Sequence, residues 1–515
     1  ASPQGAPDPA AAARTFAAHE RWAEALPHFD AALAVATATL QLELRRERAL
    51  ALRGLGNLEG ALAELAAVGA ANPDGEAGRQ AQLDWVQTIG WSGDMQRALA
   101  GYREFAAAYP TDPRAPVALG RAIILLEELG DLEGAAQVRL ELGRGYPAAE
   151  GADRALFLAG MHFYDAGRYD EALGAWDELA RRSAGLVAAQ ATFWKARVAE
   201  ARGAADAAAD LRDTARATAP DSYYAARANE LAGSVPQGSV PPGAPIPEAD
   251  WRTLEDWLAG WAGGEPYRLA ERGYPPEVAQ DSAVMRAVAL AEVGLISESI
   301  DEWRAPLRTW RDDPLKLYLL ARLAHERGVT YAALVAAERL AAISPAQGPG
   351  GVPEALRRLI YPTPYRAIVL ERSREYGLDP LALYALLRQE SHFNPAALSW
   401  VGARGLAQVM PETAQGIAQA LGMADFQQDA LFRPEVSIRF GAFYLRRQLD
   451  NLGGSLPGAL AAYNGGAGNA RRWAGGEHIA DPDLFAERID FAETRSYVKL
   501  VYGAYGAYRG MYQAE

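Results

Sequence analysis

The chain has 515 residues, 50% of them hydrophobic, and a formal net charge of −14 at pH 7, so we expect more than one folded domain. The absence of cysteine excludes disulfides, thiolate catalysis and cysteine-based zinc sites, and without an uninterrupted apolar run of about 18 residues we expect no membrane span. Residues 351–515 contain 17 basic and 17 acidic side chains, so the acidic excess lies in the first 350 residues, where it is a poor match for nucleic acid.

The chain begins with the small residues "ASPQGAPDPAA" and without an initiator Met. Signal-peptide cleavage favours small residues around the cut. We therefore expect a mature, exported form whose signal peptide has been removed. The alternative is a chain that has been trimmed for another reason.

Residues 10–232 are rich in Ala, Leu, Glu and Arg and predict a nearly continuous series of helices. Glycine-centred turns interrupt the helices at successive spacings of 37, 37, 37 and 36 residues. A second marker repeats in the same register, because three prolines are also 37 residues apart. The turn glycines are Gly56, Gly93, Gly130, Gly167 and Gly203, and the prolines are Pro73, Pro110 and Pro147.

Each unit of this series consists of a turn, a pair of small or apolar residues such as Ala61 and Leu62, and then an apolar helix. This is the pattern of helix-turn-helix repeats, in which neighbouring units complete each other's core. The units resemble tetratricopeptide repeats, although they are longer than the usual length of about 34 residues. The fold expected for residues 10–232 is an α-superhelix. On sequence alone, its expected function is that of a scaffold.

Two proline-rich and glycine-rich stretches divide the rest of the chain. Residues 233–250 contain several prolines and no helical period, which predicts a linker. Helical pattern resumes at Trp251, so we expect a second helical-repeat domain over residues 251–348. The next break, "ISPAQGPGGVPEAL", precedes a C-terminal domain that we place at residues 355–515.

An acidic residue stands on the apolar face of a helix in "LALYALLRQESHFNP", residues 381–395. Asp379 and Pro380 are expected to start this helix, and Glu390 follows Leu386 and Leu387 by four and three residues, on the same face. An apolar setting raises the pKa of a carboxyl group, which can then act as the general acid of a glycosidase. The alternative is that Glu390 turns to solvent or caps a neighbouring backbone.

Ordinary glycoside hydrolysis requires a second carboxylate, so we looked for a partner of Glu390. The helix dipole explains an acid at Glu412, in the first turn of an expected helix. Asp425, Asp429 and Glu435 are expected in polar loops. Only Glu493, in "IDFAETRSYVKLVYGAY", has an apolar flank and an unusual setting.

Two further segments carry candidate ligand-binding groups. In "LSWVGARGLAQVMPETAQG", closely spaced glycines allow the backbone to approach a ligand, and Gln408 and Met410 follow them. In "LAAYNGGAGNARRW", Tyr463 and Asn464 end an apolar helix, and a hydroxyl beside an amide suits sugar hydroxyl and N-acetyl groups. Alternatively, Tyr463 is a core aromatic residue with its hydroxyl at the surface.

The four segments "RQESHFNP", "SWVGARGLAQVMPETA", "AAYNGGAGNARRW" and "FAETRSYVK" resemble soluble lytic transglycosylases in order and approximate spacing. The resemblance covers roughly residues 380–500, and it implies a lysozyme-like, mostly helical catalytic domain behind an α-superhelix. It implies that Glu390 alone serves as general acid and then base, cleaving the bond between N-acetylmuramic acid and N-acetylglucosamine to leave a 1,6-anhydro product. In that family the substrate's acetamido group is thought to replace the second carboxylate, and neither metal nor cofactor is required.

The resemblance also assigns the surroundings of Glu390. It places one group of residues around the acid and the reacting sugars, and it gives Glu493 a binding role in the glycan or stem-peptide groove. Ala407, Ala467, His392 and Arg404 depart from the residues usual in the family, without removing the acid. The residues expected around the acid are Ser399, Gln408, Met410, Tyr463 and Asn464.

The expected partners are therefore peptidoglycan glycan strands and stem peptides, not nucleic acid, in the periplasm or cell envelope. Two alternatives remain from the sequence. One is a muramidase that uses water in place of the muramoyl 6-hydroxyl. The other is a repeat scaffold whose inactive C-terminal domain binds cell-wall glycan.

Overall fold

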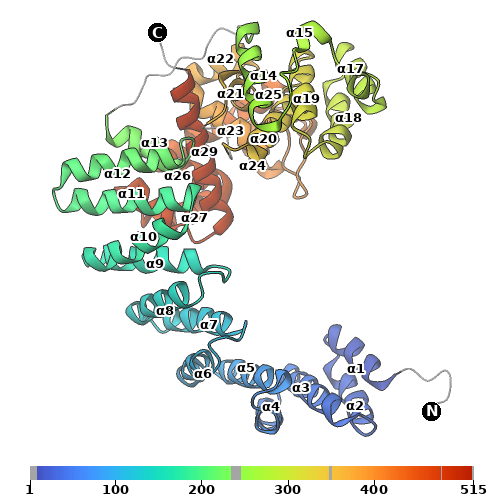
Figure 1. Cartoon of the computed structure of the whole chain (residues 1–515), viewed down its shortest axis with the longest axis vertical. Coiled ribbons are helices and arrows are strands. Elements are labelled where there is room, and N and C mark those ends of the chain that lie inside the picture. The colour runs from blue at the N-terminus through green and yellow to red at the C-terminus, as the bar shows by residue number, and fades with distance from the viewer. Residues whose placement is uncertain (1–7, 234–244, 347–350, 477, 513–515) are drawn as a thin grey trace. The chain divides into compact units, whose positions relative to one another are not determined.

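The structure is a computed structural model that describes residues 8–233, 245–346, 351–476 and 478–512, and it contains helices but no named β-strand in those ranges (Figure 1). The mainly α fold class predicted from composition is confirmed. Extended pairing in the described part of the chain is limited to two isolated bridges, one from Leu398 to Arg404 and one from Arg404 to Val409. The chain divides into two compact units, residues 1–183 and 184–515.

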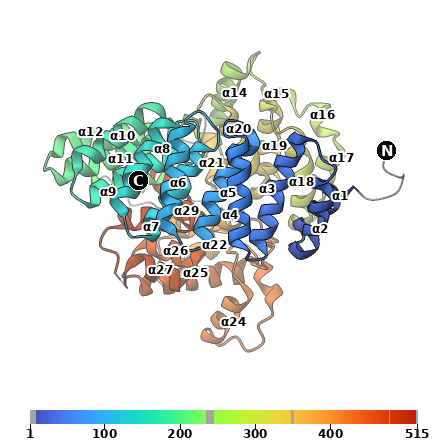
Figure 2. The same cartoon turned by 90° about the horizontal axis from the view of Figure 1, so that it is seen from below.

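The first unit is a row of antiparallel helix pairs, in which each helix packs on the next one in the chain (Figure 2). Its helices are α1 (Pro9–Ala18), α2 (Trp22–Leu33), α3 (Ala38–Gly54), α4 (Leu58–Ala71), α5 (Glu76–Trp91), α6 (Met95–Ala108), α7 (Ala115–Glu128), α8 (Leu132–Gly145), α9 (Ala152–Asp165) and α10 (Tyr169–Arg182).

The predicted repeat period corresponds to these helix pairs. The five turn glycines all adopt positive φ, from 73° to 90°, a conformation that side chains other than glycine adopt at a cost. Three turns also share a helix cap at the same 37-residue spacing: Asn57, Asp94 and Asp131 each accept a hydrogen bond from the amide three residues later. Pro73, Pro110 and Pro147 lie between successive pairs.

Neighbouring pairs share a hydrophobic core, as the repeat logic requires. One cluster of buried residues joins Val86 of α5, Phe105 of α6, Leu119 of α7, Leu142 of α8 and Ala155 of α9. A single pair could not bury these side chains by itself, so each pair depends on its neighbours for stability.

The second unit contains the remaining helices. These are α11 (Gly185–Ala201), α12 (Ala205–Thr218), α13 (Tyr223–Leu231), α14 (Glu248–Ala262), α15 (Leu269–Arg272), α16 (Pro276–Ala279), α17 (Ser282–Glu292), α18 (Ile296–Thr309), α19 (Pro314–Glu326), α20 (Thr330–Ile343), α21 (Glu354–Ile360), α22 (Arg366–Tyr376), α23 (Pro380–Ser391), α24 (Pro411–Ala420), the 3-10 helix η2 (Gln428–Phe432), α25 (Pro434–Asn451), α26 (Leu456–Gly465), α27 (Ala467–Ala474), α28 (Pro482–Arg488) and α29 (Ala492–Met511).

The division between the units differs from the expected domain boundaries. It lies at residue 183, inside the predicted repeat array 10–232, whereas the expected linker was 233–250. Residues 234–244 of that linker lie outside the described residues, and its last residues already belong to α14. Both expected later domains, 251–348 and 355–515, fall within the second unit. The repeat helices α11 to α13 therefore belong to the second unit.

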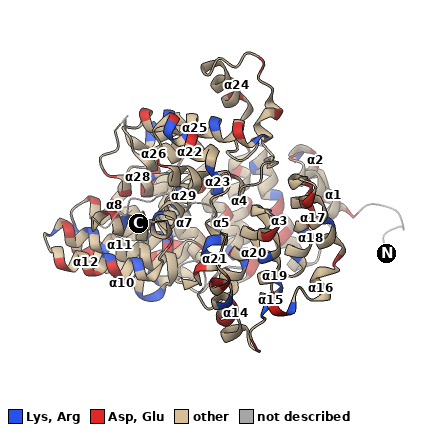
Figure 3. Ribbon diagram, turned by 90° about the horizontal axis from the view of Figure 1, so that it is seen from above, with Lys and Arg blue, Asp and Glu red and all other residues tan. Residues whose placement is uncertain are grey.

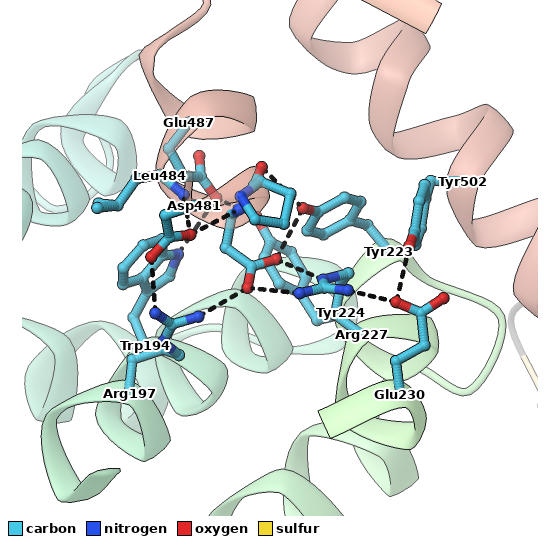
Figure 4. A network of polar contacts seen from close by, with 12 residues as sticks. Trp194, Arg197, Tyr223, Tyr224, Arg227, Glu230, Asp481, Leu484, Glu487 and Tyr502 are labelled. Carbon is cyan, nitrogen blue, oxygen red and sulfur yellow. Dashed lines mark hydrogen bonds and ion pairs between the residues drawn. The ribbon is translucent and has the colours of Figure 1, made fainter. Parts of the chain in front are cut away.

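Buried charges explain why α11 and α13 belong to the second unit (Figure 4). Asp483 of α28 is 1% exposed and accepts hydrogen bonds at 2.8 Å from Arg197 Nη1, Arg227 Nε and the Tyr223 hydroxyl. Glu487, one turn later, accepts a hydrogen bond from the Tyr224 hydroxyl at 2.6 Å and another from the ammonium of Lys499, in α29, at 2.7 Å. Asp483 is thus compensated by the guanidinium groups of α11 and α13, and Glu487 by the ammonium from α29 together with the hydroxyl from α13.

Elsewhere the charges lie mostly at the surface. The ribbon of Figure 3, coloured by residue type, shows acidic and basic residues interspersed along the helices of each unit. None of the helices in the four described ranges combines the length and hydropathy that a membrane crossing requires. The C-terminal helix α29 packs against α23, α26 and α13, and it is the central support of the region around Glu390.

Candidate active site

Helix α23 positions Glu390 as the sequence predicts. Asp379 caps the helix by accepting a hydrogen bond from the Leu381 amide at 2.8 Å, and Pro380 occupies the first turn. Every side chain from Leu381 to Arg388 is buried. The helix ends directly after Glu390, because His392 and Phe393 both adopt left-handed conformations, with φ of 49° and 61°. Glu390 is therefore held in the last turn of a helix whose body is fixed in the core.

The carboxyl group of Glu390 has one hydrogen-bond donor from a distant part of the chain. The hydroxyl of Tyr497, a buried residue of α29, donates to Oε1 of Glu390. Burial raises the pKa of Glu390 to about 7, although the hydrogen bond from Tyr497 favours the charged form and lowers it. Within the described residues, no charged side chain contributes to this shift. A carboxyl group with this pKa can both donate and accept a proton near neutral pH.

Tyr463 completes a cluster with Glu390 and Tyr497. Its hydroxyl donates to the Ala407 carbonyl at 2.7 Å, and its ring packs edge-on against Tyr444 at 5.1 Å. Burial, and after it the charge of Glu390, raise the pKa of both Tyr463 and Tyr497 well above its ordinary value. Both phenols therefore remain protonated hydrogen-bond donors over the range in which Glu390 titrates.

The glycine-rich loop, residues 396–410, is a tight hairpin beside these tyrosines. Gln408 has a φ of 46°, and its side-chain nitrogen donates to the carbonyls of Ala397 at 3.0 Å and Gly405 at 2.8 Å. Ser399 Oγ accepts from the Ala403 amide at 2.9 Å. A Cβ atom at Gly405 would lie 1.9 Å from the Leu431 carbonyl oxygen, so only glycine fits there. Gln408 and Ser399 thus hold the hairpin's shape.

The other predicted site residues lie around this cluster with greater exposure. Met410 precedes α24 and is 41% exposed. Asn464 is exposed at the end of α26, where its Oδ1 accepts from the Thr494 hydroxyl at 2.7 Å. Glu493 is the neighbour of Thr494 in the first turn of α29 and is exposed. Asn464 and Glu493 are therefore brought to the same helix start, at a surface that a ligand can reach.

None of the considered second carboxylates shares the surroundings of Glu390. Glu412, Glu435 and Glu493 are exposed acids in the first turns of α24, α25 and α29, where the helix dipole favours them. Asp425 is exposed, and Asp429 forms an ion pair with Arg404 at 2.6 Å. The half-buried, desolvated setting of Glu390 is thus not repeated at any of these five positions.

The structure adds residues that the sequence reasoning did not assign. Arg388, two residues before Glu390, points to a different side of the helix, where it pairs with Glu338 of α20 and donates to the Ile360 carbonyl at 2.8 Å. His392 Nε2 lies 3.4 Å from Glu338. Burial raises the pKa of Glu338, but His392 and Arg388 outweigh it and hold that pKa below its ordinary value. Arg388, the nearest cation on α23, therefore forms its ion pair with Glu338 and does not neutralise Glu390.

Tyr497 was also missed, although its segment was noted. In sequence it is one more aromatic residue in an apolar helix, "SYVKLVYGAY", and such residues usually fill a core. The only available signal was its place within "FAETRSYVK", the last of the four segments. Its partner lies 107 residues earlier, and sequence spacing cannot reveal such a pairing.

The region of the chain that contains Glu390 is similar to known proteins. Residues 367–485 match the family model described as the Transglycosylase SLT domain. Over 150 residues the chain is 37% identical to the soluble lytic murein transglycosylase of Salmonella typhimurium, covering 29% of this chain and 23% of that protein. Over 128 residues it is 40% identical to the same enzyme of Escherichia coli, covering 24% and 20%. The matched segment thus spans less than a quarter of these relatives.

The fold is similar over a longer range. An X-ray structure of an inactive mutant of lytic transglycosylase Slt from Pseudomonas aeruginosa matches with a TM-score of 0.62 and 21% identity, over 96% of this chain and 79% of that one. At this identity the match establishes the fold alone. The resemblance of the C-terminal region to soluble lytic transglycosylases is confirmed by the family model and the curated relatives. The segment that the family model matches includes Glu390, Gln408 and Tyr463.

Proposed function

We propose that the chain is a peptidoglycan lytic transglycosylase with Glu390 as its single catalytic acid and base. The observation that carries this proposal is the half-buried carboxyl of Glu390, whose pKa is raised to about 7 by desolvation against the hydrogen bond from Tyr497, in a setting that none of the five other carboxylates compared with it shares. The curated relatives are named lytic murein transglycosylases, and the Pseudomonas aeruginosa enzyme is described as inactive with a glutamate-to-glutamine change. Both descriptions support the proposal.

In the first step, protonated Glu390 donates its proton to the glycosidic oxygen between N-acetylmuramic acid and N-acetylglucosamine. The bond from C1 of the muramoyl sugar to that oxygen breaks, and N-acetylglucosamine leaves with the proton. The substrate's acetamido group stabilises the positive charge that develops at C1. A proton donor with a pKa near the working pH is suited to this step.

In the second step, ionised Glu390 removes the proton from the muramoyl 6-hydroxyl, and that oxygen bonds to C1. The product is a 1,6-anhydro-muramoyl end, no water is consumed, and Glu390 has regained its proton. The Tyr497 hydroxyl stabilises the ionised form that exists between the two steps. This dependence on both protonation states explains the value of a pKa near 7.

The remaining predicted residues would bind the strand. We assign Gln408 and Ser399 to the hairpin that faces the reacting sugars, and Tyr463, Asn464 and Met410 to the walls around them. Glu493 would contact glycan or stem peptide at the start of α29. Because the substrate is cell-wall material, we further propose that the protein acts in the periplasm or cell envelope.

A digest of purified peptidoglycan tests the proposal. The parent chain is incubated beside Glu390→Gln, and the soluble products are analysed by mass spectrometry. The parent should release fragments with anhydro-muramoyl ends, which lack one water relative to hydrolytic fragments. Glu390→Gln should release none while still sedimenting with the wall.

Other outcomes separate the alternatives. Reducing muramic acid ends from the parent would identify a muramidase. Wall binding without any cleavage by the parent would identify a glycan-binding scaffold. Cleavage by Glu390→Gln at the parent rate would reject Glu390 as the catalytic group.

A further inference from the structure

Trp400 is the most exposed large hydrophobic side chain in the described part of the chain. It is 97% exposed, and it stands in the hairpin of residues 396–410 together with other exposed apolar groups. An exposed apolar patch of several large side chains is typical of a surface that binds a ligand or a partner. Leu398 is 61% exposed, Val401 47% and Met410 41%. We call these four residues, Leu398, Trp400, Val401 and Met410, the rim patch.

The rim patch is held by a rigid turn. Trp400 and Val401 occupy the centre of a turn that the Gly402 amide closes by donating to the Ser399 carbonyl at 3.0 Å. The Ser399 amide donates to the Ala403 carbonyl at 3.0 Å, and the Gly405 amide donates to the Ala397 carbonyl at 2.8 Å. A platform that is already ordered loses little conformational entropy when it binds.

The same hairpin forms one wall of the candidate active site. Its Ala407 carbonyl accepts the hydrogen bond from Tyr463, and its Leu406 carbonyl accepts one at 2.9 Å from Ser391, the residue after Glu390. The rim patch is therefore continuous with the backbone that borders Glu390.

The charge of the hairpin selects the kind of ligand. Arg404 is the only charged residue in the sequence 396–410, and it forms an ion pair with Asp429 at 2.6 Å. The surface around Trp400 thus combines apolar side chains with neutral backbone groups. It suits an uncharged pyranose ring, whose C–H face packs on an indole, better than it suits a charged stem peptide.

We propose that the rim patch is a stacking platform for a sugar ring of the glycan strand, with Trp400 as its central contact. This inference rests on the proposed function, since it names how the same site would hold its polymeric substrate. It makes Trp400 a binding residue without any part in proton transfer. Its loss should weaken strand binding and leave the chemical step intact.

The test measures the binding of peptide-free glycan strands by isothermal titration calorimetry, in chains that also carry Glu390→Gln so that no cleavage occurs. Trp400→Ala should weaken binding about tenfold, as for a buried tryptophan contact at an interface. Trp400→Tyr should restore most of the affinity. Trp91→Ala is the matched control, because Trp91 is also exposed, at 61%, and belongs to the first unit. It should bind as the parent does.

A second measurement uses the active chain. Trp400→Ala should raise KM for soluble strands about tenfold with little change in kcat, as expected for an interaction that is equal in the ground and transition states. Its melting temperature should match that of the parent, because an exposed side chain contributes little to stability.

Unchanged glycan affinity and KM in Trp400→Ala would overturn the platform, even if Glu390 remains essential for cleavage. A change of sedimentation coefficient with unchanged glycan affinity would also overturn it, and would identify the patch as a contact between copies of the chain. Failure of the proposed function is a separate result, in which the parent itself neither binds nor cleaves glycan.

Discussion

The hydroxyl of Tyr497 donates a hydrogen bond to Oε1 of Glu390, and so joins helices α29 and α23 at the half-buried acid of the candidate site. The two influences on this acid oppose each other, because burial favours the protonated form and the hydrogen bond favours the ionised form. Their balance sets a pKa of about 7, near the pH at which both protonation states are populated.

The first prediction removes the hydrogen bond. Tyr497→Phe should raise the pKa of Glu390 above about 7, by roughly one unit for a hydrogen bond of ordinary strength. Since proton donation requires protonated Glu390, the fall of kcat/KM on the alkaline side should move to higher pH. Tyr444→Phe is the control, because it retains the ring packed on Tyr463. An alkaline limb that stays in place, or moves to lower pH, would contradict the assigned role of the hydroxyl.

The second prediction concerns stability. Glu390 has a pKa of about 7 when folded against 4.5 for an ordinary glutamate, so the unfolded chain ionises first as pH rises. As the pH rises from 4.5 to about 7, the free energy of unfolding therefore falls by about 3 kcal/mol in all. Glu390→Gln lacks this loss, so its melting temperature relative to the parent should increase as pH rises from 4 to 8. A difference that stays constant over this range would show that burial does not raise the pKa.

The third prediction tests the packing of α25 against the hairpin. A Cβ atom at Gly441 would lie 2.6 Å from the Ala407 Cβ and 3.5 Å from the Tyr463 hydroxyl oxygen. Gly441→Ala should displace the Ala407 carbonyl from Tyr463, with a destabilisation of about 1–3 kcal/mol for overpacking and a loss of activity. Thermal unfolding and the wall digest measure the two effects.

Gly416→Ala provides the comparison for this experiment. Gly416 is also helical, in α24, but a Cβ atom there meets nothing within 4 Å. That substitution should stabilise the chain by about 0.4–1 kcal/mol, because alanine is the better helix former. Equal effects of the two substitutions would show that the hairpin does not depend on the close approach at Gly441.

The fourth prediction addresses the buried carboxylates of α28. Asp483→Asn removes the charge that Arg197 and Arg227 share. It should destabilise by about 1–3 kcal/mol, because the two arginines keep Asp481 and Glu230 as partners. Asp490→Asn breaks the pair with Arg472 instead, whose side chains are both about half exposed, and should destabilise by no more than about 1 kcal/mol. Calorimetric unfolding measures both. If both variants lose a similar, small amount of stability, then this network does not join α11 and α13 to α28.

Much of this protein could be predicted from sequence because the underlying interactions are local. Turn glycines at positive φ, and the caps at Asn57, Asp94 and Asp131, act within a few residues, so they repeat in the sequence as they repeat in the structure. The helix that holds Glu390, and its apolar surroundings, follow from the spacing of that residue from Leu386 and Leu387. Neither inference requires knowledge of the path of the chain.

The tertiary structure decided the pairings between distant segments. It placed Tyr497 on Glu390, turned Arg388 toward Glu338, and joined α11 and α13 to α28 through Asp483, which moved the boundary between units into the repeat array. Each pairing joins residues separated by 50 positions or more, and any buried donor or acceptor must find some partner. Sequence patterns predicted the helices, turns and caps, because those depend on residues close together in the chain, while the path of the chain set which distant groups meet.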